Sequence, residues 1–200
     1  LDIRNSSILH ALIGAANIRL PVFNLNTIAT ITDSGGSSVH PFVNFTSDAF
    51  PEIWTSNAFL SSGGIITTTN ANFINCFHGI NLSWQRVSAS TQINLVNFTH
   101  NPSLATNGNL WYPFNTVSQT ETGIFILNYS HYTTIQNSTF TNIKYGIRSN
   151  ACFSLRLYDN FFDDCEIGVS ARRYGTTFTS ASLILRNDFE DCYIAIQIDG

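Results

Sequence analysis

The sequence predicts an all-β solenoid, a single-stranded right-handed parallel β-helix of about seven coils. A signature of the form Phe-x-x-Cys-x-x-Gly-Ile recurs along the chain, at a spacing of roughly 22 to 28 residues. Short runs in which apolar and polar residues alternate lie between the copies, as they do in β-strands. The composition agrees, because only 11% of the residues are charged and Asn, Thr, Ser, Ile and Phe are abundant.

The signature is clearest in residues 160–169 and 187–196, and residues 138–147, 71–80 and 6–15 fit the same frame. Each copy has a large apolar residue, then a small or apolar residue three positions later, then Gly or Ala after three more. Two degenerate copies, with no Cys-x-x-Gly tail, add two further coils. The anchors of the successive coils are Ile8, Phe45, Phe73, Phe98, Phe140, Phe162 and Phe189.

Each part of the signature has a physical role in a coil. The anchor ends a strand and points inward, two polar residues turn the corner, and the Cys position points inward again. We expect the Gly to permit the next bend. Since one coil cannot bury its apolar face alone, coils stack and like residues lie above like. The residue before the inward Cys position is Asn or Asp in four coils, which predicts left-handed turn residues and a hydrogen-bonded ladder. These residues are Asn75, Asn142, Asp164 and Asp191.

Residues 1–200 are expected to form one β-helix segment with no internal domain boundary. Insertions are predicted at about 16–41, 46–64 and 99–122, where the repeat is interrupted by Pro, Gly and Trp. Both ends fall inside the repeat pattern, so we expect the segment to belong to a longer chain and to contact neighbouring coils or domains of that chain.

The repeats resemble the parallel β-helix repeats of the pectate-lyase-like superfamily, in particular the Asn-, Thr- and Phe-rich repeat regions of large exported Bacteroidota proteins. The resemblance implies a secreted or cell-surface bacterial protein. It does not imply one activity, because the superfamily contains lyases, hydrolases, epimerases, adhesins and scaffolds.

Three of the cysteines, Cys76, Cys165 and Cys192, share the inward position of the signature. The first interpretation is a set of buried free thiols, which behave as small apolar side chains. The alternative is a disulfide between Cys165 and Cys192 on consecutive coils. No Cys-x-x-Cys motif occurs, so a zinc site is not expected.

Acidic residues concentrate on the last two coils, with pairs at Asp163–Asp164 and Glu190–Asp191. They are either solvated turn residues or oxygen ligands of Ca²⁺. No motif requires a cofactor, and calcium is the one metal that the sequence suggests. The resemblance adds a third interpretation, because pectate-lyase-like enzymes bind Ca²⁺ with outward acids on adjacent coils and use Arg or Lys as the base. The catalytic candidates are therefore Asp163, Asp164, Glu190, Asp191, Arg172 and Arg173.

Several large aromatic residues lie outside the anchor positions: Trp54, Trp84, Trp111, Tyr112 and Phe114. They either pack their own loops onto the solenoid wall or stack on sugar rings as ligand-binding residues. The histidines show no diagnostic ligand or catalytic spacing, and we expect His78 to be a surface turn residue.

The sequence leaves two functions open. The first is a noncatalytic segment of an exported or cell-surface protein, which is structural, adhesive or faces a carbohydrate such as a polysaccharide or cell-surface glycan. The alternative is a polysaccharide lyase or glycoside hydrolase, although the Asn-Thr-Asp and Gly-His-Gly motifs of polygalacturonases are absent. A net charge of −4 without a basic run argues against nucleic acid, and no apolar run is long enough for a membrane span. The two functions differ in whether the acids, Arg172, Arg173 and the loop around Trp111 converge on one face.

Overall fold

Every regular element that the computed structural model describes is a β-strand. The described residues are 6–9, 13–18, 30–34, 43–46, 57–62, 65–69, 72–74, 78–83, 91–100, 122–127, 133–150, 152, 154–172 and 182–199. Within these ranges there is no helix, and therefore no helix long and apolar enough to span a membrane.

The strands form three parallel sheets, and each strand pairs with the strand three places later in the chain. The first sheet contains β1 (Ser6–Leu9), β4 (Val43–Thr46), β7 (Asn72–Ile74), β10 (Asn97–Thr99), β13 (Thr139–Thr141), β16 (Phe161–Asp163) and β19 (Asp188–Glu190). The second contains β2 (Ile13–Ile18), β5 (Asn57–Ser62), β8 (His78–Ser83), β11 (Thr122–Leu127), β14 (Tyr145–Asn150), β17 (Ile167–Arg172) and β20 (Ile194–Asp199). The third contains β3 (Thr30–Ser34), β6 (Ile65–Thr69), β9 (Thr91–Asn94), β12 (Thr133–Gln136), β15 (Leu155–Tyr158) and β18 (Leu183–Leu185).

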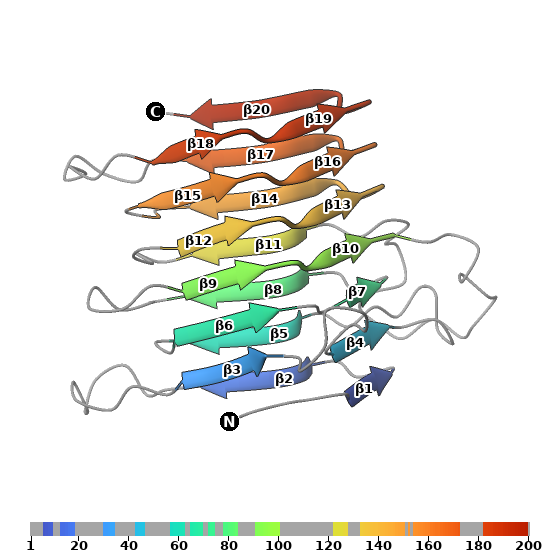
Figure 1. Ribbon diagram of the computed structural model, residues 1–200, viewed down its shortest axis with the longest axis vertical. Coiled ribbons are helices and arrows are strands. Elements are labelled where there is room, and N and C mark those ends of the chain that lie inside the picture. Colours follow the sequence, from blue (N-terminus) through green and yellow to red (C-terminus); the bar gives the residue numbers. More distant parts are fainter. Residues whose placement is uncertain are drawn as a thin grey trace.

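This order describes a chain that visits the three sheets in turn and then repeats the path one strand spacing higher (Figure 1). All pairings between the described strands are parallel, and the short repeats stack as the signature predicted. The architecture is therefore that of a parallel β-helix, a solenoid whose core lies between the sheets.

The anchor residues of the signature form one continuous column in the first sheet, which confirms the predicted register. Ile8 pairs with Phe45, Phe45 with Phe73, and the pairing continues through the later anchors to Phe189. Neighbouring rings from Phe73 to Phe189 stack with centroids 4.7–4.9 Å apart. The rings of Phe98, Phe140 and Phe162 are fully buried, so this column is the centre of the core.

The signature glycines serve a different purpose from the one expected. They lie near the start of the second-sheet strands, and none of Gly79, Gly123, Gly146 and Gly168 has a left-handed conformation. A Cβ atom on Gly146 would lie 2.5 Å from the carbonyl oxygen of Gly168 and 2.6 Å from Cδ1 of Phe162. Glycine is required because the anchor ring and the backbone of the following coil occupy that space, and not because the chain bends there.

The coil anchored by Phe98 is more regular than its sequence suggested. Thr122 pairs with Tyr145 and Ile124 with Ile147, so Gly123 lies in the glycine column. The predicted insertion of residues 99–122 thus separates the anchor from its glycine without removing either. In the same way, β5 lies inside residues 46–64, where the sequence predicted an insertion, and takes part in the second sheet.

The corner that follows each anchor contains the predicted left-handed residues. Asn142, Asp164 and Asp191 have φ values of 54°, 50° and 49°, whereas Asn75 lies outside the described residues. The ladder at this corner runs mainly through the backbone, because the Asn142 N–H donates to the Asp163 carbonyl at 3.0 Å and the Asp164 N–H to the Glu190 carbonyl at 3.1 Å. A carboxylate cannot donate, so aspartates cannot extend a side-chain ladder here.

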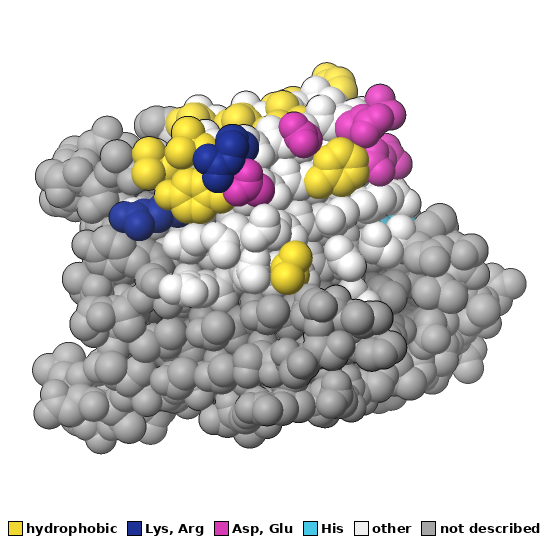
Figure 2. Space-filling view, viewed as in Figure 1, with side chains coloured by type: hydrophobic (Ala, Val, Ile, Leu, Met, Phe, Trp, Pro, Cys, Tyr) yellow, Lys and Arg dark blue, Asp and Glu magenta, His cyan; other side chains and the backbone are white. Residues whose placement is uncertain are grey.

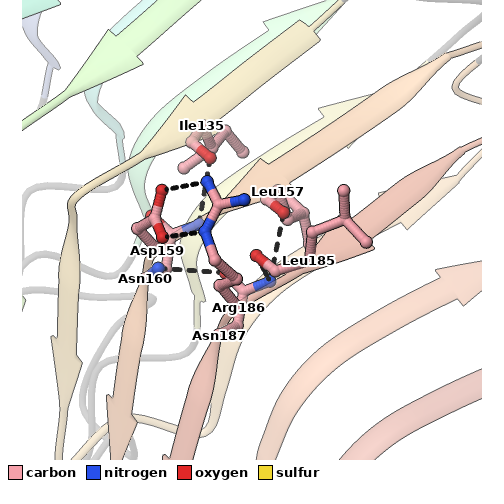
Figure 3. A network of polar contacts seen from close by, with 7 residues as sticks. All are labelled: Ile135, Leu157, Asp159, Asn160, Leu185, Arg186 and Asn187. Carbon is pink, nitrogen blue, oxygen red and sulfur yellow. Dashed lines mark hydrogen bonds and ion pairs between the residues drawn. The ribbon is translucent and has the colours of Figure 1, made fainter.

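The side-chain ladder lies at the opposite corner, between the third and first sheets. The Ser138 N–H donates to Asn160 Oδ1 at 3.0 Å, and the Asn160 N–H donates to Asn187 Oδ1 at 3.0 Å. The residues just before the ladder positions are left-handed, and on the last two coils they are Asp159 and Arg186. Figure 3 shows the ladder with the bidentate ion pair beside it, in which Arg186 donates to Asp159 at 2.7 and 2.8 Å.

Candidate functional site

The acidic residues of the last two coils lie on the outer side of the first sheet. Asp163 and Glu190 end β16 and β19, pair in register, and alternate with the inward anchors of these strands. Asp164 and Asp191 follow in the left-handed conformation and are exposed. Acidic side chains gather at this edge of the molecule in Figure 2. The structure therefore brings the predicted acids together on neighbouring coils.

The proximity of these acids is not in itself a metal site. Among the residues that the structure describes, no group of three or more His, Cys, Asp or Glu side chains is placed to hold a metal ion. Ca²⁺ takes six to eight oxygen ligands. Calcium binding at Asp163, Asp164, Glu190 and Asp191 remains a prediction, which a calcium titration of the melting curve tests.

The basic candidate lies on a different sheet from the acids. Arg172 is the last residue of β17 in the second sheet, and its register partner is Asp199 of β20. Asp163 lies in the first sheet, on the strand that precedes β17. Asp163 and Glu190 thus do not line one sheet face with Arg172. Arg173 lies outside the described residues.

The loop aromatics that the sequence suggested as sugar contacts cannot be compared with this geometry. Trp54, Trp84, Trp111, Tyr112 and Phe114 all lie outside the described residues. The structure instead reveals a group of aromatic and basic residues on, or directly before, three neighbouring strands of the second sheet. We call it the aromatic–cation cluster, and its members are His78, Phe125, Lys144, Tyr145 and Arg148.

The cluster is centred on the guanidinium of Arg148. Its Cζ atom lies 4.9 Å from the ring centroid of Tyr145 and 5.4 Å from that of Phe125. The ammonium of Lys144 lies 5.6 Å from the Tyr145 centroid. His78 completes the group, with its ring centroid 5.2 Å from that of Phe125. These distances are those of cation–π and aromatic contacts.

The alternation of the strands explains why Phe125 and Arg148 lie outside the core. Ile124, Ile126 and Ile147 have no exposed surface and point inward, so the residues between them point outward. Phe125 and Arg148 are register partners on β11 and β14, and both are partly exposed. An outward aromatic and an outward cation on paired strands therefore meet one strand spacing apart. The sequence carried a signal for this contact, since each residue directly follows a Gly-Ile pair.

His78 is neutral in this environment. Burial and, to a smaller extent, the positive charge of Arg148 together lower its pKa from 6.5 to about 4. The residue opens β8 and is half-buried, which corrects the expectation of a surface turn residue. At neutral pH the positive charge of the cluster therefore comes from Arg148 and Lys144.

The described inward cysteines are free thiols. Cys165 is buried, and Cys192 of the following coil is half-buried. Cys76 lies outside the described residues. Cys152, which is not part of the signature, is also free, and its pKa is raised by burial.

Comparison of the chain with protein-family models, with curated proteins and with solved structures gave no match in any of the three. The class of protein is therefore defined by the architecture alone, as a solenoid of three parallel sheets.

Proposed function

We propose that the chain is a right-handed parallel β-helix of about seven coils that acts as a noncatalytic, saccharide-facing segment of an exported or cell-surface protein. The right hand is supported by the strong preference of parallel crossover connections for that hand. The coil number is supported by two sheets of seven strands and one of six. The location is supported by the resemblance of the repeats to the exported proteins of the pectate-lyase-like superfamily.

The aromatic–cation cluster is the observation that carries the saccharide proposal. The apolar faces of sugar rings stack on aromatic side chains, and Phe125 and Tyr145 are both partly exposed on the outer face of the second sheet. The guanidinium of Arg148 lies over both rings. The N–H groups of a guanidinium lie at its edge, in a geometry that matches carboxylate or sulfate. The ligand class that fits best is therefore an acidic saccharide.

The geometry of the solenoid also favours an extended ligand. Neighbouring strands are about 4.8 Å apart, so β8, β11 and β14 present side chains at a regular repeat. A polymer with a regular repeat can contact successive strands of such a surface. Many weak contacts along a chain then add to useful affinity.

The distribution of the acids supports a binding function over the enzyme alternative. A lyase or hydrolase needs its acids and its base around one reacting group, within hydrogen-bond reach. Asp163 and Glu190 lie on the first sheet and Arg172 on the second. No described observation favours a polysaccharide lyase or glycoside hydrolase.

Binding of acidic polysaccharides to the purified chain, measured by calorimetry or on a glycan array, tests this function. We expect Arg148→Ala and Tyr145→Ala to lose binding without unfolding. Arg156→Ala is the matched control, because Arg156 is an exposed cation on β15 of the third sheet. Equal loss in the Arg156 variant would show nonspecific charge attraction and contradict the site. Release of unsaturated or reducing sugar by the wild type would replace the binding function with the enzyme alternative.

A further inference from the structure

Cys165 and Cys192 occupy equivalent places in adjacent coils. The pairs that flank them, Asp163 with Glu190 and Ile167 with Ile194, are register partners. The Tyr193 N–H donates to the Cys165 carbonyl at 3.0 Å, which holds the two corners together. The two cysteines therefore lie directly above one another, one strand spacing apart.

Their thiols also have the same orientation. Cys165 Sγ donates to the Phe140 carbonyl at 3.5 Å, and Cys192 Sγ donates to the Phe162 carbonyl at 3.6 Å. In both cases the acceptor is the anchor of the preceding coil. Because the same bond recurs one coil later, the two sulfur atoms are related by the strand spacing of about 4.8 Å.

This spacing is unfavourable for a disulfide. A disulfide needs sulfur atoms about 2.05 Å apart and Cβ atoms about 3.5–4.5 Å apart. Side chains that are stacked in register keep their Cβ atoms about one strand spacing apart, which is longer. Closing the bond would thus require movement of the tightly stacked corner.

The same spacing is favourable for a cation held between the two sulfur atoms. A metal–thiolate bond is about 2.3 Å long for Zn²⁺, so two such bonds in line span about 4.6 Å. Linear coordination by two sulfur atoms is typical of soft d¹⁰ monovalent cations, and thiolates select Cu(I) among biological metals. The column offers only two sulfur atoms among the described coils, because the preceding coil has Ile143 at this position, where the Glu166 N–H donates to its carbonyl.

We propose that Cys165 and Cys192 form a two-coordinate site for Cu(I), a site distinct from the saccharide face. On binding, one S–H bond breaks in each cysteine and two Cu–S bonds form. The two protons pass to solvent, and no electron is transferred. Affinity therefore rises with pH.

The surroundings of the site suit this chemistry. Cys165 is buried and packs in the hydrophobic core, with Phe189 and Cys192 packed against the same core. Such apolar surroundings limit access of water and oxidants to Cu(I). Cys192, the second ligand, is half-buried. Burial, together with the neighbouring Cys192, raises the pKa of Cys165 to about 12, so protons compete with the ion at neutral pH as well as at low pH.

Anaerobic competition between the protein and a chromogenic Cu(I) chelator tests the site. The wild type is expected to retain one Cu(I) per chain, and Cys192→Ser and Cys165→Ser are each expected to lose it. Cys152→Ser is the matched control and is expected to retain the ion, because Cys152 is a free thiol that lies outside this column. Retention by Cys192→Ser, or equal loss in Cys152→Ser, would overturn the proposal.

A second measurement uses only the wild-type protein, so it does not depend on whether a variant folds. X-ray absorption of the wild-type complex is expected to show two sulfur ligands in line, and Ag(I) is expected to bind in the same way without redox chemistry. Three or more ligands, or oxygen or nitrogen in the first coordination sphere, would contradict the site. Rapid formation of a Cys165–Cys192 disulfide in air by protein that retains no Cu(I) would also contradict it.

Discussion

The stacking of each anchor ring on a glycine of the preceding coil makes Gly146→Ala the most informative single change in the core. The new Cβ would lie 2.5 Å from the Gly168 carbonyl oxygen and 2.6 and 2.7 Å from Cδ1 and Cε1 of Phe162. Phe162 cannot move aside easily, because its ring is fully buried and stacks at 4.7 Å on both Phe140 and Phe189. The Gly168 carbonyl oxygen is held by the sheet, so neither it nor the Phe162 ring can move away from the new Cβ atom.

The magnitude follows from two opposing effects. Overpacking a well-ordered core by one methyl group costs about 1–3 kcal/mol. Replacing glycine by alanine reduces the entropy of the unfolded chain and returns about 0.4–1 kcal/mol. We therefore expect a net loss of about 1–2 kcal/mol in the free energy of unfolding. For a chain of this size, that corresponds to a fall of about 2–8 °C in Tm.

Urea denaturation and calorimetry of the wild type and Gly146→Ala measure this difference. Ala195→Gly is the matched control, because Ala195 opposes Gly168 in the same column and is exposed. Its loss of about 0.5–1 kcal/mol should reflect backbone entropy alone. Phe162→Leu in the Gly146→Ala background should give a coupling of at least about 0.5 kcal/mol. Wild-type stability of Gly146→Ala, or simple additivity with Phe162→Leu, would refute the role assigned to the ring.

Two further predictions concern polar groups in and beside the core. The pKa of His78 is lowered from 6.5 to about 4, so the unfolded chain binds the extra proton first and stability falls as the pH decreases from 6.5 to 4. At about 1.4 kcal/mol for each pKa unit the loss reaches about 3 kcal/mol, and His78→Gln should remove this part of the pH dependence in urea titrations. Asn160→Ala should cost about 2–4 kcal/mol, because it leaves the Ser138 N–H without its buried acceptor and removes the bond to the Ile135 carbonyl. Asn187→Ala, on the last described coil and half-buried, should cost less, and equal losses in the two variants would contradict the ladder.

The sequence predicted the anchor column completely because a large buried side chain cannot be replaced by a polar one without exposing or breaking the core. From Ile8 to Phe189 every predicted anchor pairs with the next. The role of the glycines could not be predicted in the same way. It depends on the ring of the following coil, for example Phe98 above Gly79, and this contact is between residues far apart in the sequence.

Of the polar features, one was predicted from the sequence and one was missed. The left-handed conformation of Asn142 and Asp164 is a local property of these residue types and was predicted correctly. The side-chain ladder was missed, although Ser138, Asn160 and Asn187 all lie two residues before an anchor. Its signal was visible in the alignment of the repeats, but Asn at a turn has the same appearance whether it bonds locally or to the next coil.

The aromatic–cation cluster was not predicted because its members are separated along the chain and belong to three coils. Phe125 and Arg148 meet only through the parallel register of β11 and β14. Outward residues of strands show no periodic signal beyond alternation. The one available signal, that Phe125 and Arg148 each follow a Gly-Ile pair, indicates a contact only once the two strands are aligned in register.

The central functional claim is that the outer face of β8, β11 and β14 binds an acidic saccharide. Titration of the isotopically labelled chain with an acidic oligosaccharide, followed by NMR, tests it most directly. We predict that the largest chemical-shift changes occur at Phe125, Tyr145 and Arg148, and that Arg156 on the third sheet is unaffected. Changes centred on the third sheet, or no saturable change with any acidic oligosaccharide, would contradict the account.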